Sequence, residues 1–197
     1  MPDDYIELLY LRNNANAWLK IEKSFVGWGV ELIFALNGYS SSSEGNEFFS
    51  HRGDSNDIIS LFSDKTLTVN NHTYTTAYSL SSLNNYEQVS INLKQNNTTT
   101  ISGHIQYGST SVDVSRPSDG YTNGTYITLF RGSDNPFGKS KRLDLYKAKI
   151  FDKENVLQLD LVPAKRSLDG YLGFFDKLTN TFYACEGQPN LEAGPEV

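Results

Sequence analysis

Apolar and polar residues alternate along several short segments of the chain. The clearest segment is QVSINLK at residues 88–94, where Val89, Ile91 and Leu93 share one face and polar residues occupy the other. The segment TISGHIQY at residues 100–107 repeats this alternation after a polar connection. A period of two residues predicts half-buried β-strands. The polar connection predicts that the two strands form a hairpin.

One segment slips out of phase. In RLDLYKAKIFD, Leu143 and Leu145 share a face, but Tyr146, Ala148 and Ile150 then continue the pattern one residue later. A slip of one residue would turn every following side chain to the other face of a regular strand. We therefore predict a β-bulge between Leu145 and Tyr146.

The remaining patterns favour an all-β fold. The segment WGVELIFAL at residues 28–36 is apolar on both faces, which is typical of a central strand covered on both sides. No long segment has helical periodicity, and no Pro/Gly-rich linker divides the chain. We predict one antiparallel two-sheet jelly-roll sandwich over residues 1–197, in which residues 187–197 form a mostly irregular tail.

Composition and charge exclude several classes of function. The chain has 197 residues, a net charge of −6 and a single cysteine, Cys185. An internal disulfide framework needs paired cysteines, and nucleic-acid binding needs a basic surface. No segment reaches the roughly 18 apolar residues of a membrane span. The N-terminus has Asp3 and Asp4 where an export signal would carry positive charge. We therefore expect no nucleic-acid partner, no membrane insertion and no conventional export signal.

The C-terminal quarter of the chain carries a run of short motifs separated by turns. In chain order they are Ile150-Phe151-Asp152, Pro163 with Arg166, Gly173-Phe174-Phe175-Asp176, and Phe182-Tyr183. This order resembles the C-terminal half of concanavalin A-like lectin/glucanase domains. More narrowly, it is similar to the laminin-G-like (LamG-like) jelly rolls of phage virion proteins and bacterial surface proteins. The N-terminal segments YIELLYL and WLKI match the opening strands of that family more loosely.

The resemblance implies structural roles for the C-terminal motif residues. We expect Gly173 to allow the close approach of a neighbouring chain. Asp176 is expected to accept backbone hydrogen bonds within the turn DKLTN, and Phe175 to pair with Tyr183 across a hairpin. On this interpretation the motif is a clasp that closes the core, and a ligand platform is the alternative.

The resemblance also implies a function in binding. We expect a non-enzymatic virion surface protein of a bacteriophage, such as a capsid decoration, head-fibre or tail component. Its partners would be other virion proteins or further copies of itself, with host glycans as ligands. The alternative is a carbohydrate-binding or adhesion module on a bacterial cell surface. A glycoside hydrolase is a third hypothesis.

Candidate catalytic and metal-binding residues are sparse. A retaining glycosidase needs two carboxyl groups about 5–5.5 Å apart, and the nearest pairs in sequence are Glu44 with Glu47 and Asp152 with Glu154. Both pairs fall in predicted loops or turns, so we expect surface positions and no enzymatic activity. No required cofactor is expected.

Calcium remains an open alternative. Asp54, Asp57 and Asp64 lie close together in the sequence and could supply oxygen ligands.

Sugar binding would require exposed aromatic rings beside hydrogen-bonding side chains. The candidates are Trp28 together with Tyr121, Asn123 and Arg131, the last three in or beside the segment SDGYTNGTYITLFRG. Trp18 is a further aromatic candidate that could equally belong to the core. Binding residues concentrate in loops, so the Tyr121 segment is the candidate ligand site, while a glycine-rich connector is the favoured interpretation of the same segment.

Overall fold

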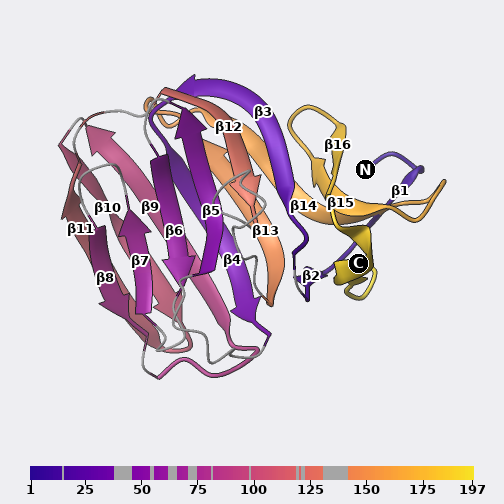
Figure 1. Cartoon of the computed structure of the whole chain (residues 1–197), viewed down its shortest axis with the longest axis horizontal. Helices are drawn as coiled ribbons and strands as arrows, with labels where there is room; N and C mark the ends of the chain where they lie inside the picture. Colours follow the sequence, from indigo (N-terminus) through magenta and orange to yellow (C-terminus); the bar gives the residue numbers. More distant parts are fainter. Residues whose placement is uncertain are drawn as a thin grey trace.

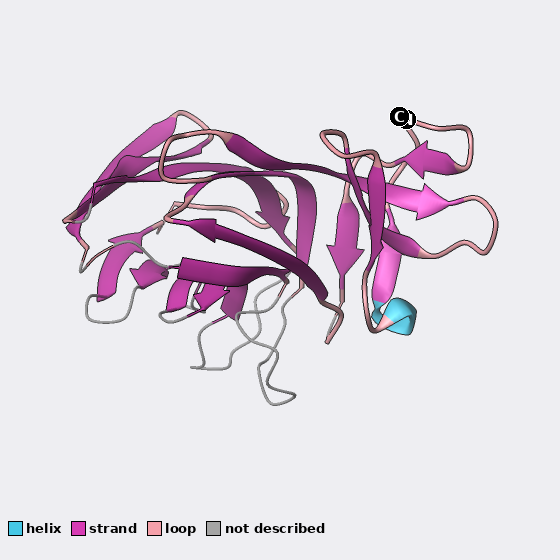
Figure 2. Ribbon diagram, turned by 90° about the horizontal axis from the view of Figure 1, so that it is seen from above, coloured by secondary structure: helices cyan, strands magenta, loops and turns pink. Residues whose placement is uncertain are grey.

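The fold is a two-layer β-sandwich. The computed structural model describes residues 1–14, 16–37, 46–53, 56–61, 66–70, 75–80, 82–97, 99–118, 120, 123–130 and 142–197. Within these residues, the strands form one sheet of eleven strands and one of six. The two sheets lie face to face (Figure 1, Figure 2). The predicted all-β sandwich is confirmed.

The large sheet has eight strands on its main path. In spatial order they are β11 (Thr110–Pro117), β10 (Thr100–Tyr107), β9 (Gln88–Asn97), β4 (Gly29–Leu36), β13 (Leu143–Phe151), β14 (Leu157–Arg166), β15 (Leu172–Asp176) and β16 (Thr181–Ala184). Three short strands join it at the side: β1 (Tyr5–Glu7) pairs with β14, while β2 (Leu11–Asn13) pairs with β13 and β17 (Leu191–Ala193).

The small sheet covers one face of the large one. Its spatial order is β3 (Leu19–Val26), β12 (Asn123–Leu129), β5 (Asn46–Gly53), β6 (Asn56–Leu61), β7 (Thr66–Asn70) and β8 (Thr75–Ser79). The hairpins at the C-terminal end of the large sheet, β14 to β16, extend beyond the edge of this second layer (Figure 2).

The space between the sheets is filled by apolar side chains. Among the largest that are fully buried are Trp28, Phe34, Phe49, Phe130 and Phe174. Burying one large apolar side chain contributes roughly 1.5–3 kcal/mol. This interior is therefore the main source of stability, and it needs no disulfide; Cys185 is a buried free thiol.

The strand predictions made from alternation agree with the pairing. β9 and β10 form an antiparallel hairpin in which Val89 lies opposite Tyr107. The register between β13 and β4 shifts between Leu145 and Lys147, which leaves Tyr146 as the extra residue of a bulge. Both the hairpin and the bulge are confirmed.

Strand β4 lies in the middle of the large sheet, between β9 and β13. Its inner face carries Val30, Leu32 and Phe34, all buried in the sandwich core. The prediction that another layer covers both faces is wrong. On the outer face Ile33 is only half-buried, and it contributes to a cleft.

Strands β15 and β16 form the C-terminal hairpin that closes the core, and their residues pair differently from the prediction. Phe175 lies opposite Phe182, and Phe174 lies opposite Tyr183, so the predicted pair of Phe175 with Tyr183 is wrong. The turn between Asp176 and Thr181 fixes this register. Because side chains alternate between faces, Phe174 enters the sandwich core while Phe175 packs in a separate small cluster on the outer face.

Two residues hold the clasp. Asp176 is fully buried, and its Oδ1 accepts hydrogen bonds from the backbone N–H groups of Asp160 and Leu178 at 2.9 and 3.1 Å. Its Oδ2 accepts one from the Thr179 hydroxyl at 2.7 Å. A Cβ on Gly173 would lie 2.1 Å from the backbone oxygen of Tyr183, so only glycine allows the two strands this close.

The last residues form regular structure where a mostly irregular tail was predicted. Gln188–Asn190 is a 3₁₀ turn, and β17 pairs with β2. Glu196 then bridges to Leu8, which places the C-terminal end of the chain beside the connection between β1 and β2. No helix among the described residues has the length and apolar character to cross a membrane.

Candidate functional site

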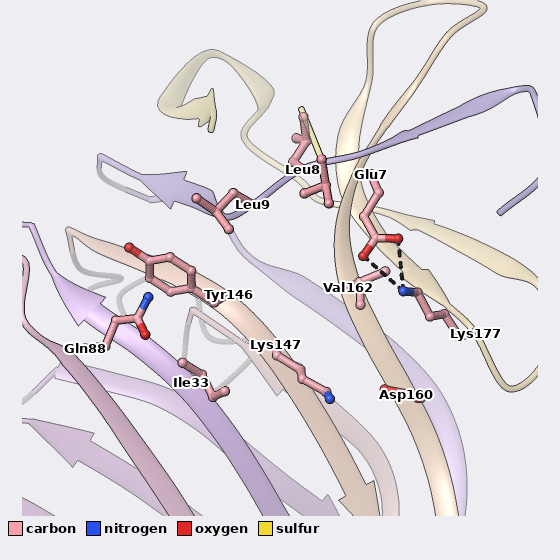
Figure 3. A pocket seen from close by; sticks show the side chains of 11 residues that line it. Glu7, Leu8, Leu9, Ile33, Gln88, Tyr146, Lys147, Asp160, Val162 and Lys177 are labelled. Atoms are coloured by element: carbon pink, nitrogen blue, oxygen red, sulfur yellow. Dashed lines mark hydrogen bonds and ion pairs between the residues drawn. The ribbon is translucent and has the colours of Figure 1, made fainter. Parts of the chain in front are cut away.

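The large sheet forks between β13 and β14. These strands pair from Ala148 opposite Leu161 to Phe151 opposite Leu157. Before Ala148, β13 runs beside β2, and after Leu161, β14 runs beside β1. A cleft of about 430 Å³ lies on the outer face of the sheet at this fork, and we call it the fork cleft (Figure 3).

The floor of the fork cleft is apolar. Ile33 of β4 and Val162 of β14 lie on the outer face of the sheet, and Leu8 and Leu9 come from the connection between β1 and β2 (Figure 3). Backbone hydrogen bonds from Leu8 to Pro163 and from Leu9 to Pro195, of 2.9 and 2.8 Å, fix that connection. The floor is therefore built on paired backbone.

An aromatic group borders the cleft at the β13 bulge. The bulge turns Tyr146 toward the cleft, and its ring centroid lies 5.4 Å from that of Tyr10. The Arg12 guanidinium lies over the rings of both Tyr10 and Tyr86, at 5.2 and 5.9 Å. We call Tyr10, Tyr86 and Tyr146 the tyrosine cluster. Bulges commonly re-aim a side chain beside a functional site.

An ion pair between Arg12 and the buried Asp144 holds the tyrosine cluster in place. Arg12 donates two hydrogen bonds to the buried carboxylate of Asp144, at 2.7 and 2.8 Å, and this pairing raises the pKa of the guanidinium further above its ordinary value. Burial raises the pKa of Tyr146, while a hydrogen bond with Gln88 opposes that effect.

Tyr86 is the most exposed member of the tyrosine cluster, at 60%. Its backbone is left-handed, with φ of 63°. This conformation is unfavourable for a bulky residue, and such local strain is concentrated at functional sites.

Charged side chains border the cleft on its other side. Lys177 and Glu7 form an ion pair in which the lysine Nζ lies 3.0 and 2.9 Å from the two carboxylate oxygens (Figure 3). Lys147 has no hydrogen-bond or ion-pair partner among the described residues. Asp160 keeps Oδ1 buried without a donor, and its Oδ2 is 4.0 Å from the Nζ of Lys149. That distance is too long for a hydrogen bond.

The fork cleft thus combines an apolar floor, the Tyr146 ring, the Lys147 ammonium and the Asp160 carboxylate, and neither of these charged groups has a side-chain hydrogen bond within the described part of the chain. This combination is typical of small-molecule sites, where a few polar groups orient a ligand over an apolar surface. The chemistry it offers is recognition by packing and hydrogen bonding.

Only part of the predicted sugar site lies in the described residues. Trp28 is fully buried in the core beside Phe49, so its prediction as a sugar-stacking residue is wrong. Asn123 is exposed at the start of β12 and borders a separate hollow of about 320 Å³ together with Phe25 and Gly124. Tyr121 and Arg131 lie outside the described residues.

Trp18 is half-buried, and its backbone bridges to Glu186 beside the start of β3. It lies away from the residues that border the fork cleft.

The predicted calcium residues are placed only in part. Asp54 and Asp64 lie outside the described residues, and Asp57 lies in β6 without a described side chain. Across the described ranges, no group of three or more His, Cys, Asp or Glu side chains could hold a metal ion.

Of the two candidate carboxylate pairs, the structure describes the side chains of only one, Asp152 with Glu154. Glu44 lies outside the described residues, and Glu47 lies in β5 without a described side chain. Asp152 caps the turn between β13 and β14: its Oδ1 accepts hydrogen bonds from the N–H groups of Glu154 and Val156, at 3.0 and 2.9 Å. Glu154 forms an exposed ion pair with Lys153 at 2.8 Å.

The other motif residues belong to the C-terminal clasp. Pro163 lies opposite Phe174, within the β14–β15 pairing. Arg166 donates hydrogen bonds to both carboxylate oxygens of Asp169, at 3.0 and 2.5 Å, and also lies over the Phe182 ring at 5.5 Å.

Sequence reasoning missed the fork cleft. Its residues come from β1, β4, β13, β14 and the C-terminal turns, and no spacing along the chain links them. The one usable signal was the predicted bulge at Tyr146, because bulges often lie beside functional sites.

Comparisons with known proteins agree with the fold. No family model and no curated protein matches the sequence. A solved structure of a SAP-like heptameric pentraxin from Limulus polyphemus aligns with a TM-score of 0.50 at 8% identity, over 75% of this chain and 77% of that chain. At this identity the likeness shows the fold alone, a β-sandwich of the jelly-roll type.

Two peptidase structures also align. Scytalido-glutamic peptidase with a transition state analog inhibitor has a TM-score of 0.45 at 16% identity, over 80% of this chain and 89% of that one. SCP-B of the Eqolisin family, in complex with a tripeptide, has a TM-score of 0.39 at 11% identity, over 93% and 98%. Both TM-scores are too low to support a conclusion about this chain's fold or activity. What is established is therefore the architecture: the chain is an antiparallel β-sandwich similar to the pentraxin jelly roll.

Proposed function

We propose that this chain is a non-enzymatic binding protein of a bacteriophage virion surface that holds a host glycan in the fork cleft. The observation that carries the binding part is the fork cleft itself, with its apolar floor of Ile33 and Val162 and the Tyr146 ring at its border. The virion part is supported by the resemblance of the C-terminal motifs to phage LamG-like jelly rolls.

A sugar matches this cleft in size and chemistry. Aromatic rings pack against the apolar C–H faces of a sugar ring, and Tyr146 offers such a ring at the cleft. Sugar hydroxyls both donate and accept hydrogen bonds, so they can serve the side chains of Asp160 and Lys147, which have no hydrogen-bond partner among the described residues. Hydrogen bonds to charged groups are stronger than those between neutral groups.

A glycan array with the purified chain tests the binding. We expect the Tyr146→Ala variant to bind the captured glycan roughly tenfold more weakly than wild type, a loss of about 1.4 kcal/mol. Tyr171→Ala is the matched control, because Tyr171 is 45% exposed but does not border the cleft. Absence of any bound glycan, or equal binding by wild type and the Tyr146→Ala variant, would contradict the proposal.

Localisation on particles tests the virion part. Antibodies against the chain, or cryo-imaging of intact particles, should place it on the capsid, a head fibre or the tail, in contact with other virion proteins or further copies of itself. The alternative, an adhesion module of a bacterial surface, predicts the same glycan binding but labels cells in the absence of phage. Density or label confined to cells would favour that alternative.

A further inference from the structure

Lys147 and Asp160 of the fork cleft lie on the same outer face of the sheet as Ile33 and Val162. In the register between β13 and β4, Lys147 lies directly opposite Ile33. Asp160 and Val162 are two residues apart on β14, so their side chains share a face. Neighbours along a strand with this spacing are roughly 6.5–7 Å apart, and adjacent strands are about 4.8 Å apart. All four side chains line the fork cleft.

These four side chains offer three different kinds of contact. Ile33 and Val162 offer an apolar floor. Lys147 offers an ammonium donor with no partner among the described residues. Asp160 offers a carboxylate acceptor whose Oδ1 is buried without a donor and whose Oδ2 is 4.0 Å from Lys149. A buried polar group without a partner is costly, so a ligand that supplies the missing hydrogen bond is favoured.

We propose that the fork cleft selects glycans that contain a 2-acetamido sugar, an inference that rests on the proposed function. The acetamido group has one N–H donor, one carbonyl acceptor and one methyl group. Its N–H donates to the Asp160 carboxylate, and its carbonyl oxygen accepts from the Lys147 ammonium. Its methyl group packs on Ile33 and Val162.

Related sugars lack part of this set. A 2-hydroxyl sugar has no methyl group to cover the apolar floor. A 2-amino sugar carries an ammonium group in place of the acetamido group. It has no carbonyl acceptor for Lys147, and its positive charge would lie beside the Lys147 ammonium. A site that hydrogen-bonds a ligand group discriminates strongly against analogues without that group, because its own polar atoms are then left unpaired.

Three tetrasaccharides with the same β-1,4 backbone test the selection. Chitotetraose carries the acetamido group, cellotetraose carries a hydroxyl, and the glucosamine tetramer carries an ammonium. By titration calorimetry with the full chain, we expect chitotetraose to bind at least tenfold more tightly than the other two. Asp160→Ala and Ile33→Ser should reduce this preference to within about twofold.

The matched control is Lys94→Ala, which removes a lysine from the outer face of β9 that does not border the cleft. This variant should keep the full preference, whereas Lys147→Ala should lose it. Equal binding of chitotetraose and cellotetraose that is still weakened by Tyr146→Ala would overturn the acetamido inference and leave the glycan-binding function standing. An acetamido preference that survives in Asp160→Ala would also overturn it. Absence of binding to all three tetrasaccharides and to every array glycan would overturn both.

Discussion

A buried histidine should make the stability of the sandwich sensitive to acid. His51 faces the core from β5 and is fully buried, with its ring stacked on Phe25 at 4.4 Å and an interplanar angle of 11°. Neither ring nitrogen has a hydrogen-bond partner in the part of the chain that the structure describes. Burial disfavours the charged imidazolium, which lowers the pKa of His51 from 6.5 to about 4.

The expected magnitude follows from proton linkage. Between pH 6.5 and about 4, the unfolded chain binds a proton at His51 that the folded chain does not bind. The free energy of unfolding therefore falls as the pH falls through this window, and below about pH 4 His51 causes no further loss. At about 1.4 kcal/mol for each pH unit, the total loss is on the order of 3 kcal/mol.

Urea unfolding of wild type and His51→Phe, measured from about pH 7.5 to pH 4, isolates this effect. The variant keeps an aromatic ring against Phe25 but cannot be protonated, so its advantage over wild type should grow by about 3 kcal/mol toward low pH. His104→Gln is the control, because His104 is exposed and its loss leaves His51 in place. Parallel pH profiles for wild type and His51→Phe would refute the reasoning.

Two further predictions concern the C-terminal clasp. Asp176→Ala removes three hydrogen bonds to a buried carboxylate and should lower the free energy of unfolding, measured by urea titration, by roughly 3–4 kcal/mol. The control is Asp3→Ala at the exposed N-terminus, which should change that free energy by less than about 0.5 kcal/mol. Gly173→Ala forces a Cβ to 2.1 Å from the Tyr183 backbone oxygen. The variant should lower the free energy of unfolding by about 2 kcal/mol or more, and with it the thermal midpoint by several degrees. Gly29→Ala, whose added Cβ meets its first neighbour at 3.4 Å, should have a much smaller effect, and equal shifts for the two glycines would contradict this account.

Local patterns determined the strands and the inward-facing residues. Alternation predicted the β9–β10 hairpin and the burial of Val89 and Ile91, because a strand between core and solvent must alternate. The phase slip predicted the bulge at Tyr146 for the same reason. These features depend on a few consecutive residues and on the two-residue period of the backbone.

The alternation of apolar and polar residues could not predict which residues pair across neighbouring strands. The pairing of Phe175 with Phe182 depends on the conformation of the turn from Asp176 to Thr181, which alternation does not specify. The burial of Trp28 was also hidden, since it lies next to the glycines of the β3–β4 turn, where a ring can face either solvent or core.

The sequence by itself therefore determined an all-β sandwich and most of its inward-facing residues, since each depends on the local repeat of side-chain direction. Only the tertiary structure decided where ligands can bind, because the fork cleft collects Glu7, Ile33, Tyr146, Asp160 and Lys177 from distant segments. It arises where β13 and β14 separate and where β1 and β2 enter beside them. That separation is set by long-range pairing of strands, which leaves no periodic trace in the sequence.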